Sequence, residues 1–404
     1  MIENSKYPKV FFILNVLLSL IAFLNIIVVK KGVNTQLFIL IASYLSMIIL
    51  NKVFNRFFFK VDESLSLILN IFLLISIVIL YRIDENLSVR QMFFILVGYG
   101  IYLVVMFLVK NIHEFYKYKW IYFSLTLIFM SLSFLIGKYI NGSKNWVSIF
   151  GITFQPSEFG KVFLVLYIAS VLRDKRCKKD KYMSIVLLLI VLSILVLQKD
   201  LGTGVIVFVL SMFMYYIKTF KYKFLSFICV CISIGGVFAY NKFNHVRVRV
   251  HAWLDPESDP NGSSYQVLQG FFSMGSGGFL GRGLYGGNVE YIPVNTTDYI
   301  FVAIVEEFGI ITGILIVLLY FLFFMRVFKK AAFLKDKFES VVLLCGFSIL
   351  ISFQALLIIG GILNLIPLTG VTLPFISYGG SSMISMFIIF SIIQKTLEER
   401  RNYE

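Results

Sequence analysis

The sequence is poor in the residues on which many soluble enzymes depend. Only 15% of its 404 residues are charged, against about 25% in an average globular chain. It has three histidines, none at the spacing of metal ligands. Of its four cysteines, one lies in a basic loop and three lie in apolar segments: Cys177, and Cys229, Cys231 and Cys345. No external disulfide, paired-cysteine zinc site or redox site is therefore expected.

Apolar residues take the place of the missing charge. They make up 59% of the chain, and the mean hydropathy is +0.87. A helix of about 17 to 25 apolar residues spans the hydrocarbon core of a membrane. Twelve candidate segments are present: residues 10–29, 37–54, 65–81, 92–109, 120–137, 158–172, 182–198, 201–217, 224–240, 299–325, 338–360 and 376–393. Because two are short, the sequence predicts an all-α, polytopic transmembrane helix bundle of ten to twelve spans.

The charged loops predict how this bundle is oriented. The net charge of +15 would raise the question of nucleic acid in a soluble protein. With the N-terminus in the cytoplasm, however, 25 Lys and Arg residues fall in cytoplasmic segments and 11 in external ones. Positive residues favour cytoplasmic loops, so both chain ends are predicted to be cytoplasmic. The basic run from Arg173 to Lys179 follows the same rule, and no nucleic-acid partner is expected.

Two predicted external segments are long, residues 138–157 and 241–298. The second is the one long extracytoplasmic loop, and it has eight glycines between Gly270 and Gly287. Such loops are usually functional or disordered, and its aromatic residues favour partial re-entry along the membrane surface. Its glycine-rich stretch lacks the Gly-Lys-Ser/Thr ending of a phosphate loop, so nucleotide binding is disfavoured. Two interpretations stay open: a flexible external loop, or backbone that closely approaches a large substrate.

Polar residues at the outer ends of the predicted spans are the candidates for a functional site, because polar residues within a membrane need a partner or a function. Glu158 and Lys161 share one helix face. Asp200 precedes a span, and Asp298 lies at the outer mouth of another. One external polar site is expected to gather these four. The alternatives are a Glu158–Lys161 ion pair that fixes helix packing and an Asp200 that only caps its helix.

Asp298 is the hardest of these residues to explain by structure alone. It has no basic neighbour within the following helix turn, which favours a free carboxylate facing a cavity. Glu306 and Glu307 follow about two turns deeper in the same span and lie about 100° apart around the helix. Since they cannot face one direction, at least one is predicted to contact a neighbouring helix.

Taken together and in order, these motifs resemble the SEDS family (shape, elongation, division and sporulation). The resemblance covers about Trp146 to the C-terminus, and five stretches carry it: Asn145-Trp146 with Phe154 to Lys161, Gln198 to Thr203, Arg249 to Gly278, Thr297 to Gly309, and Pro367 to Ser382. Lys199 stands where the family usually has proline, and Asn295-Thr296 where it has a histidine before the Thr-Asp pair. Five predicted spans precede Gln155 where the ten-span pattern has three. We therefore divide the chain into N-terminal helices with two extra spans, residues 1–137, and a family core, residues 138–404.

The resemblance implies a peptidoglycan glycosyltransferase at the outer face of the bacterial cytoplasmic membrane. Family members polymerise glycan strands from lipid II, an undecaprenyl-pyrophosphate disaccharide-peptide, with β-1,4 linkages and release of undecaprenyl pyrophosphate. The implied partners are lipid II, the nascent glycan strand, membrane lipids and a class B penicillin-binding protein. Two alternatives from other classes stay open: a lipid II flippase or other transporter, and a non-catalytic scaffold for the penicillin-binding protein.

The resemblance also gives the polar residues their expected roles. Asp298 matches the catalytic aspartate of the family and is the candidate general base. The leaving pyrophosphate needs positive charge, for which the candidates are Lys161, Arg247 and Arg249. Cavity support is expected from Glu158, Lys161, Asp200 and Glu306, and further substrate contacts from Gln198, Ser377 and Ser381. No cofactor is required by these residues. A divalent cation, Mg²⁺ or Mn²⁺, fits the chemistry, but the sequence does not identify its ligands.

Overall fold

The computed structural model describes residues 8–109, 111–140, 143–149, 152–173, 178–219, 222–334 and 337–401. The chain forms two compact units. The first unit comprises Met1–Lys110, Gln266–Arg326 and Thr372–Glu404, and the second comprises Asn111–Tyr265 and Val327–Val371. Both units draw on segments far apart in the sequence. The division at residue 137 stays a prediction about which residues form the family core.

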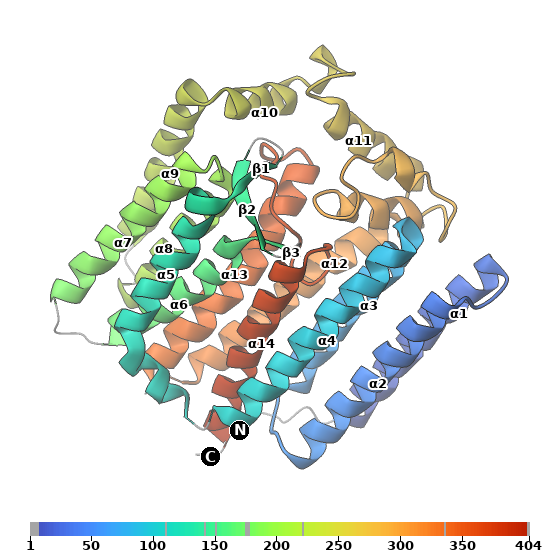
Figure 1. The fold of residues 1–404 in the computed structure, drawn as a ribbon, viewed down its shortest axis with the longest axis horizontal. Helices are drawn as coiled ribbons and strands as arrows, with labels where there is room; N and C mark the ends of the chain where they lie inside the picture. Colours follow the sequence, from blue (N-terminus) through green and yellow to red (C-terminus); the bar gives the residue numbers. More distant parts are fainter. Residues whose placement is uncertain are drawn as a thin grey trace. The chain divides into compact units, whose positions relative to one another are not determined.

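Helices dominate the first unit. Its elements are α1 Pro8–Lys30, α2 Thr35–Phe57, α3 Glu63–Ile83, α4 Glu85–Leu108, most of α11 Tyr265–Gly277, the 3-10 turn η3 Val289–Tyr291, most of α12 Ile300–Ala332, and α14 Gly380–Arg401. α4 packs against α3 and α14, while α1 and α2 pack against α3 and α4 (Figure 1). A Cβ at Gly98 of α4 would lie only 2.3 Å from the ring of Phe387 in α14. Glycine therefore lets these two helices approach closely.

The second unit combines helices with a small sheet. Its elements are η1 Ile112–Tyr118, α5 Lys119–Ile136, β1 Lys138–Ile140, β2 Ser143–Ile149, β3 Ile152–Phe154, α6 Pro156–Arg173, α7 Lys178–Leu197, α8 Leu201–Thr219, α9 Tyr222–Lys242, α10 Asn244–Leu254, η2 Pro256–Ser258 and α13 Phe338–Ile362. α6 is central to it and packs against α5, α8 and α13. Among the described residues Cys229, Cys231 and Cys345 are free thiols, whereas Cys177 lies outside them.

All twelve apolar segments predicted from the sequence coincide with helices. In the part of the chain that the structure describes, nine helices are long and apolar enough to cross a membrane, and α9 with α10, bent by 109°, adds a tenth. The other two predicted spans are α6, which carries charged residues, and α7, whose apolar part Tyr182–Leu197 is short. The chain is therefore a multi-pass membrane protein with a nearly all-helical fold.

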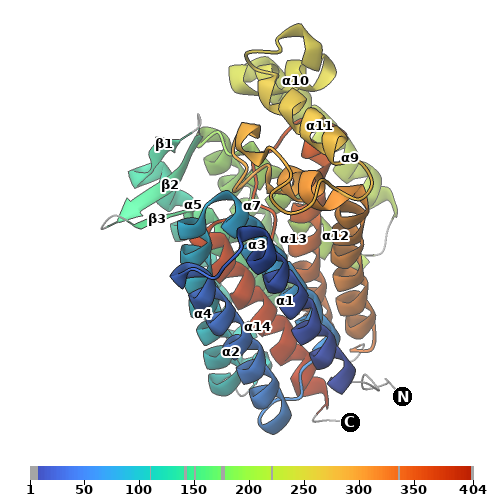
Figure 2. The ribbon, with the colours of Figure 1, turned by 90° about the vertical axis from the view of Figure 1, so that its right-hand side faces the viewer.

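The segment 138–157, expected as an external loop, contains a three-stranded antiparallel sheet in the order β1-β2-β3. In β2, Asn145 and Val147 are buried, whereas Trp146 and Ser148 are partly exposed. This alternation is typical of a strand with one covered face. β2 packs against α5 and α6, and Figure 2 shows the sheet beside α5. The sequence analysis missed the sheet because strands of three to seven residues carry little signal beside the long apolar spans.

The long segment 241–298 is also structured. It contains α10 and α11 and the short turns η2 and η3, while its partial re-entry along the membrane stays a prediction. The predicted final span over 376–393 begins later than expected, at Gly380, because the preceding residues form a non-helical segment. Irregular backbone therefore lies at the start of α12 and of α14, next to the motifs that carry the family resemblance.

α12 is broken near its start, where the sequence predicted an uninterrupted span over 299–325. Gly309 has a φ of 83° and a ψ of 167°, which is open essentially to glycine alone. The glycine-rich segment after α11 fills the break with four main-chain hydrogen bonds: Ile310 and Ile311 N–H donate to the carbonyls of Gly278 and Phe279, and Arg282 and Gly283 N–H donate to those of Glu306 and Glu307. This stretch is thus a docked element, and the flexible-loop interpretation is wrong.

Close contact makes glycine necessary on both sides of the break. A Cβ at Gly309 would lie 2.2 Å from the carbonyl oxygen of Phe279, and a Cβ at Gly281 would lie 2.2 Å from that of Glu307. Main-chain polar groups within a membrane must be paired inside the protein. The docked segment supplies partners that the broken helix cannot supply to itself.

We expect Gly309→Ala to lower the free energy of unfolding by about 3 kcal/mol, because the methyl group adds a steric clash to an unfavourable φ. Thermal unfolding of the purified protein in detergent measures this. The matched control is Gly204→Ala in α8, where the added Cβ meets nothing within 4 Å and the change should be neutral or stabilising. Equal unfolding temperatures for Gly309→Ala and the wild type would contradict the docked-segment account.

Candidate functional site

Asp298 lies in a compact turn directly before α12, in the first unit. The N–H groups of Thr297 and Tyr299 both donate to the carbonyl oxygen of Val294 and close this turn. Asp298 is half-buried and Tyr299 is buried. Asp298 also interacts with another group of the protein, so the expectation of a free carboxylate is wrong.

The non-helical segment before α14 holds the Asp298 turn in place. The Ser377 hydroxyl donates to the Thr297 carbonyl at 2.6 Å, and Tyr378 N–H donates to the Thr296 carbonyl at 2.9 Å. Ser377 Oγ in turn accepts the N–H of Leu373 at 2.9 Å. The hydroxyl of Ser377 is therefore engaged with main chain on both its donor and its acceptor side. Its predicted contact with substrate stays a prediction.

Two polar side chains from apolar helices hold this segment in its turn. Gln91 of α4 is fully buried, donates to the Ser377 carbonyl at 3.1 Å and accepts Gly379 N–H at 3.3 Å. Ser76 of α3 donates to the Ile376 carbonyl at 2.7 Å. The sequence analysis missed both residues. The signal was present, since a serine within an apolar segment and a glutamine at the edge of one need partners.

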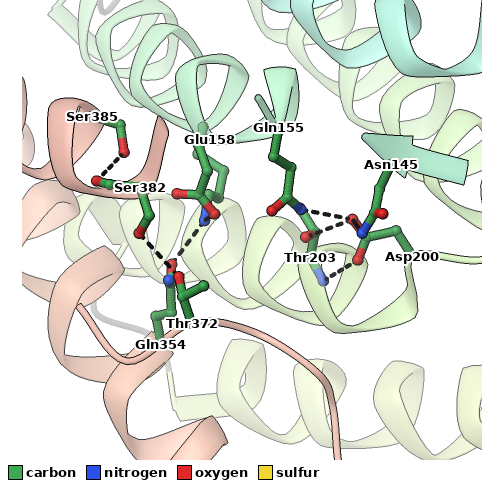
Figure 3. Close-up of polar contacts among 10 residues, drawn as sticks. Asn145, Gln155, Glu158, Asp200, Thr203, Gln354, Thr372, Ser382 and Ser385 are labelled. Atoms are coloured by element: carbon green, nitrogen blue, oxygen red, sulfur yellow. Dashed lines mark hydrogen bonds and ion pairs between the residues drawn. The ribbon is translucent and has the colours of Figure 1, made fainter. Parts of the chain in front are cut away.

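The serines that begin α14 are buried in the first unit. Ser381 is 6% exposed and has an interaction partner. Ser382 Oγ lies 3.0 Å from Thr372 Oγ1, and the Ser385 hydroxyl donates to the Ser382 carbonyl at 2.9 Å (Figure 3). These contacts hold the start of the helix, and a substrate contact of Ser381 stays a prediction.

Glu306 and Glu307 face different partners, as their angle around the helix predicts. Glu307 accepts Arg82 Nε–H from α3 at 2.7 Å, and Arg82 also donates to the Gly287 carbonyl at 3.0 Å. The prediction that one of the two contacts a neighbouring helix is therefore confirmed. Glu306 accepts the main-chain N–H of Asn288 at 2.9 Å, so it holds the loop that follows the docked glycine-rich segment.

In the second unit, Glu158 and Lys161 form the predicted buried ion pair. Lys161 Nζ lies 2.9 Å from Glu158 Oε1 and 2.8 Å from Oε1 of Gln354 in α13. Lys161 is only 1% exposed and Glu158 4%. Figure 3 shows Glu158 and Gln354 directed toward one another from α6 and α13. The hydrogen bond from Lys161 to Gln354 joins α6 to α13, which favours the packing interpretation.

Asp200 caps α8, as predicted, and does more. Its carboxylate accepts the N–H of Thr203 at 3.1 Å and the Thr203 hydroxyl at 3.0 Å. It also accepts Asn145 Nδ2 of β2 at 3.3 Å and Gln155 Nε2 at 3.4 Å, as Figure 3 shows. Asp200 thus ties the sheet and the start of α6 to the start of α8, so the cap-only interpretation is incomplete. Lys199, with a φ of 60°, makes the tight turn before it.

Gln198 is wholly buried and donates to the Met130 carbonyl at 2.7 Å, an arrangement that ties α7 to α5. Arg249 of α10 donates to the carbonyls of Leu368 and Thr369 at 3.1 and 3.3 Å. Arg247 is exposed. Only the two arginines leave part of their charge accessible, so they are the better-placed of the predicted substrate contacts.

The predicted residues fall into two groups. Glu158, Lys161 and Asp200 lie in the second unit with Arg249, whereas Asp298 and Glu306 lie in the first. A single external site gathering all of them stays a prediction. Among the residues that the structure describes, no three His, Cys, Asp or Glu side chains are grouped so as to hold a metal ion. The divalent cation stays a prediction.

We expect Glu158→Gln and Lys161→Met each to lower the free energy of unfolding by about 3 kcal/mol, because each leaves a buried charge without its counter-charge. The double variant should unfold at a higher temperature than either single variant. The control is Arg173→Met on the same helix. The Arg173 side chain is 46% exposed and lies 3.7 Å from Glu339, and exposed pairs contribute about 1 kcal/mol or less to the free energy of unfolding. Additive losses in the double variant would contradict a coupled buried pair.

Curated relatives of the chain are cell-wall enzymes. The peptidoglycan glycosyltransferase RodA of Mycobacterium tuberculosis is 31% identical over 325 residues, which cover 76% of this chain and 69% of that protein. The probable peptidoglycan glycosyltransferase FtsW of Wigglesworthia glossinidia brevipalpis is 33% identical over 302 residues, 72% of this chain and 78% of that protein.

Solved structures share the fold. A chain from a peptidoglycan synthase complex, reported for its coordination of polymerization and crosslinking, matches with a TM-score of 0.72 and 25% identity over 85% of this chain and 99% of that chain. The rod shape determining protein RodA of Thermus thermophilus matches with a TM-score of 0.58 and 24% identity, over 85% of this chain and 98% of that chain.

The family comparison covers every helix from α3 onward. A model of the FtsW, RodA and SpoVE family, described as cell cycle proteins, matches residues 64–402. The two helices before it, α1 and α2, are those that the span count predicted as additional to the family pattern. Because the match covers most of its length, the chain belongs to the FtsW/RodA/SpoVE family of cell cycle proteins, the SEDS family.

Proposed function

We propose that this protein is a peptidoglycan glycosyltransferase that polymerises glycan strands from lipid II. The observation that carries the proposal is the held turn of Asp298. Ser377 and Tyr378 bond the two carbonyls just before the aspartate, and Gln91 holds their segment in turn. A general base must be held in a fixed position. Asp298 meets this requirement, because buried polar groups anchor both its turn and the segment that holds the turn.

The proposed reaction is a displacement at the anomeric carbon of a lipid-linked sugar. The 4-hydroxyl oxygen of an acceptor GlcNAc forms the new β-1,4 bond to that carbon while the bond from the carbon to the pyrophosphate oxygen breaks. Asp298 takes the hydroxyl proton, and undecaprenyl pyrophosphate leaves with the bonding electrons. An alcohol is a weak nucleophile, so a positioned base is the expected device. Mg²⁺ or Mn²⁺ at the pyrophosphate would require oxygen ligands from the substrate itself.

We assign the charge opposite the leaving pyrophosphate to Arg247 and Arg249 rather than to Lys161. Lys161 is 1% exposed and already bonded to Glu158 and Gln354, so it supports the fold of the second unit. The guanidinium of Arg249 is half-buried and touches two carbonyls, which leaves donors for a phosphate oxygen. Arg247 is exposed, so its guanidinium is accessible to a second phosphate oxygen.

The proposed setting is the bacterial cytoplasmic membrane, with both chain ends in the cytoplasm and Asp298 on the outer side. The excess of Lys and Arg in the cytoplasmic loops supports this orientation. A class B penicillin-binding protein is the proposed partner, which the similarity to a chain of a complex joining polymerization to crosslinking supports.

We expect Asp298→Asn to abolish polymerisation, lowering the rate by a factor on the order of 10³, because the amide removes the base without changing the volume of the side chain. The assay incubates purified protein and its penicillin-binding protein with lipid II and resolves the glycan strands by gel electrophoresis. Glu257→Gln is the control, since Glu257 is an exposed carboxylate in the same external segment and has no proposed role.

The same assay separates the alternatives. If the protein were a scaffold, the wild type would make no glycan strands even with its partner present. That result would contradict the enzyme proposal. A flippase would move fluorescent lipid II across proteoliposome membranes without making strands, and Asp298→Asn would then alter transport instead of product. Full activity of Asp298→Asn would remove Asp298 from the mechanism while leaving a polymerase in place.

We expect Ser377→Ala to lower kcat by about tenfold with little change in KM, because the Asp298 turn loses its shortest anchor while the binding surface stays. Ser377→Thr keeps the hydroxyl and should recover most of the rate. Measurement of initial rates over a range of lipid II concentrations gives both constants. An effect on KM alone would instead support the predicted contact of Ser377 with substrate.

A further inference from the structure

A polar pocket lies in the first unit where α1 begins, α2 ends and α3 begins. It is open to the surroundings, and its walls include Asn15, Asn51 and Asn70, one from each helix. The ion pair of Lys52 and Glu63 also lines it. Most of the pocket-lining residues precede residue 64, where the family match begins. The pocket is therefore a feature of the two additional helices.

Three of the four asparagines that line this pocket have side-chain atoms without partners in the described part of the chain, whereas the fourth, Asn55, accepts the Tyr102 hydroxyl at 3.4 Å. Asn15 is 6% exposed and Asn70 4%, and neither side chain makes a hydrogen bond within the described part of the chain. Oδ1 of Asn51 is buried without a partner there too. Asparagines that only joined helices would bond to one another across the interface. Three amides that instead surround a cavity, in a region where each unpaired polar group is costly, indicate a polar ligand.

The ion pair of Lys52 and Glu63 gives the pocket one positive and one negative charge. Lys52 Nζ lies 3.0 Å and 3.1 Å from the two oxygens of Glu63, and each side chain is about a quarter exposed, at 25% and 23%. An ammonium donor with amide N–H groups suits a phosphate, and the carboxylate with amide oxygens suits an amine. A headgroup that carries a phosphate and an ammonium therefore matches the pocket better than a purely anionic ligand.

The surroundings point to a lipid as the source of that headgroup. The three asparagines lie about two turns from the ends of their helices, close to the depth at which headgroups meet acyl chains. At the same level, Leu14 of α1 and Ile49 and Val53 of α2 are 42%, 52% and 42% exposed. These apolar surfaces suit acyl chains beside the pocket.

We propose that this pocket binds the headgroup of a zwitterionic glycerophospholipid, of which phosphatidylethanolamine is the representative, with its acyl chains along α1 and α2. The phosphate lies against Lys52 and the asparagine N–H groups, and the ammonium lies against Glu63. The lipid then completes the packing of the two additional helices against α3. The proposal does not rest on the proposed polymerase activity, because the pocket is built by α1, α2 and the start of α3.

Native mass spectrometry of the full chain tests the proposal. Detergent-purified protein is mixed with phosphatidylethanolamine or with diacylglycerol of the same acyl chains, and the bound lipid is counted. We expect one retained phosphatidylethanolamine per chain and no comparable retention of diacylglycerol. The double variant Asn15→Leu/Asn51→Leu and the variant Lys52→Met should each weaken retention by a factor on the order of ten. Ser46→Leu, an exposed serine on α2, is the control and should retain lipid like the wild type.

The outcomes are decisive in both directions. Equal retention of diacylglycerol, or wild-type retention by both pocket variants, would overturn the headgroup site. Displacement of the lipid by soluble phosphoethanolamine at equal concentration would show that the pocket serves a water-soluble ligand and would overturn the lipid assignment. Because leucine suits a membrane helix, the variants should fold, and their thermal unfolding without added lipid checks this.

Discussion

Pairing of polar groups inside an apolar helix bundle is the constraint on which the rest of this structure depends, because lipid offers no hydrogen bonds. The break of α12 at Gly309 exposes main-chain groups that a straight helix would satisfy. The glycine-rich segment after α11 pairs with those groups. Both of the segments that meet here need glycine, because no Cβ fits between them. Glu306 then uses its carboxylate to hold the next loop through Asn288. A single helical break thereby organises the segment that leads to Asp298.

The same constraint explains how Asp298, the proposed catalytic base, can lie on irregular backbone. The Asp298 turn and the segment before α14 hold one another through main chain and Ser377, and Gln91 and Ser76 hold that segment from α4 and α3. Each of these side chains is buried where it has few alternative partners, so the arrangement has little freedom to relax. Rigid positioning of the base follows from the cost of leaving any of these groups unpaired.

The parts of the fold that depend on local patterns could be predicted from the sequence. Hydropathy located twelve of the fourteen α-helices that the structure describes. The spacing of three residues predicted the Glu158–Lys161 pair, and the position of Asp200 before an apolar run predicted its cap. The break at Gly309 could not be predicted, because Gly309 is one glycine among several and its partner segment lies about 30 residues earlier. Gln91 and Ser76 were missed for the same reason: their importance depends on contacts with residues almost 300 positions away.

The two additional helices differ from the family core in how their buried polar side chains are hydrogen-bonded. In the core, the buried Gln91 and Asp200 find partners within the protein and use them to hold non-helical segments. In α1, α2 and the start of α3, Asn15, Asn51 and Asn70 line an open pocket, and their side chains leave hydrogen-bonding capacity unused within the described part of the chain. Leucine at those positions would pack the helices at lower cost. A polar ligand that enters from the lipid side would offset this cost, and in our proposal a phospholipid headgroup is that ligand.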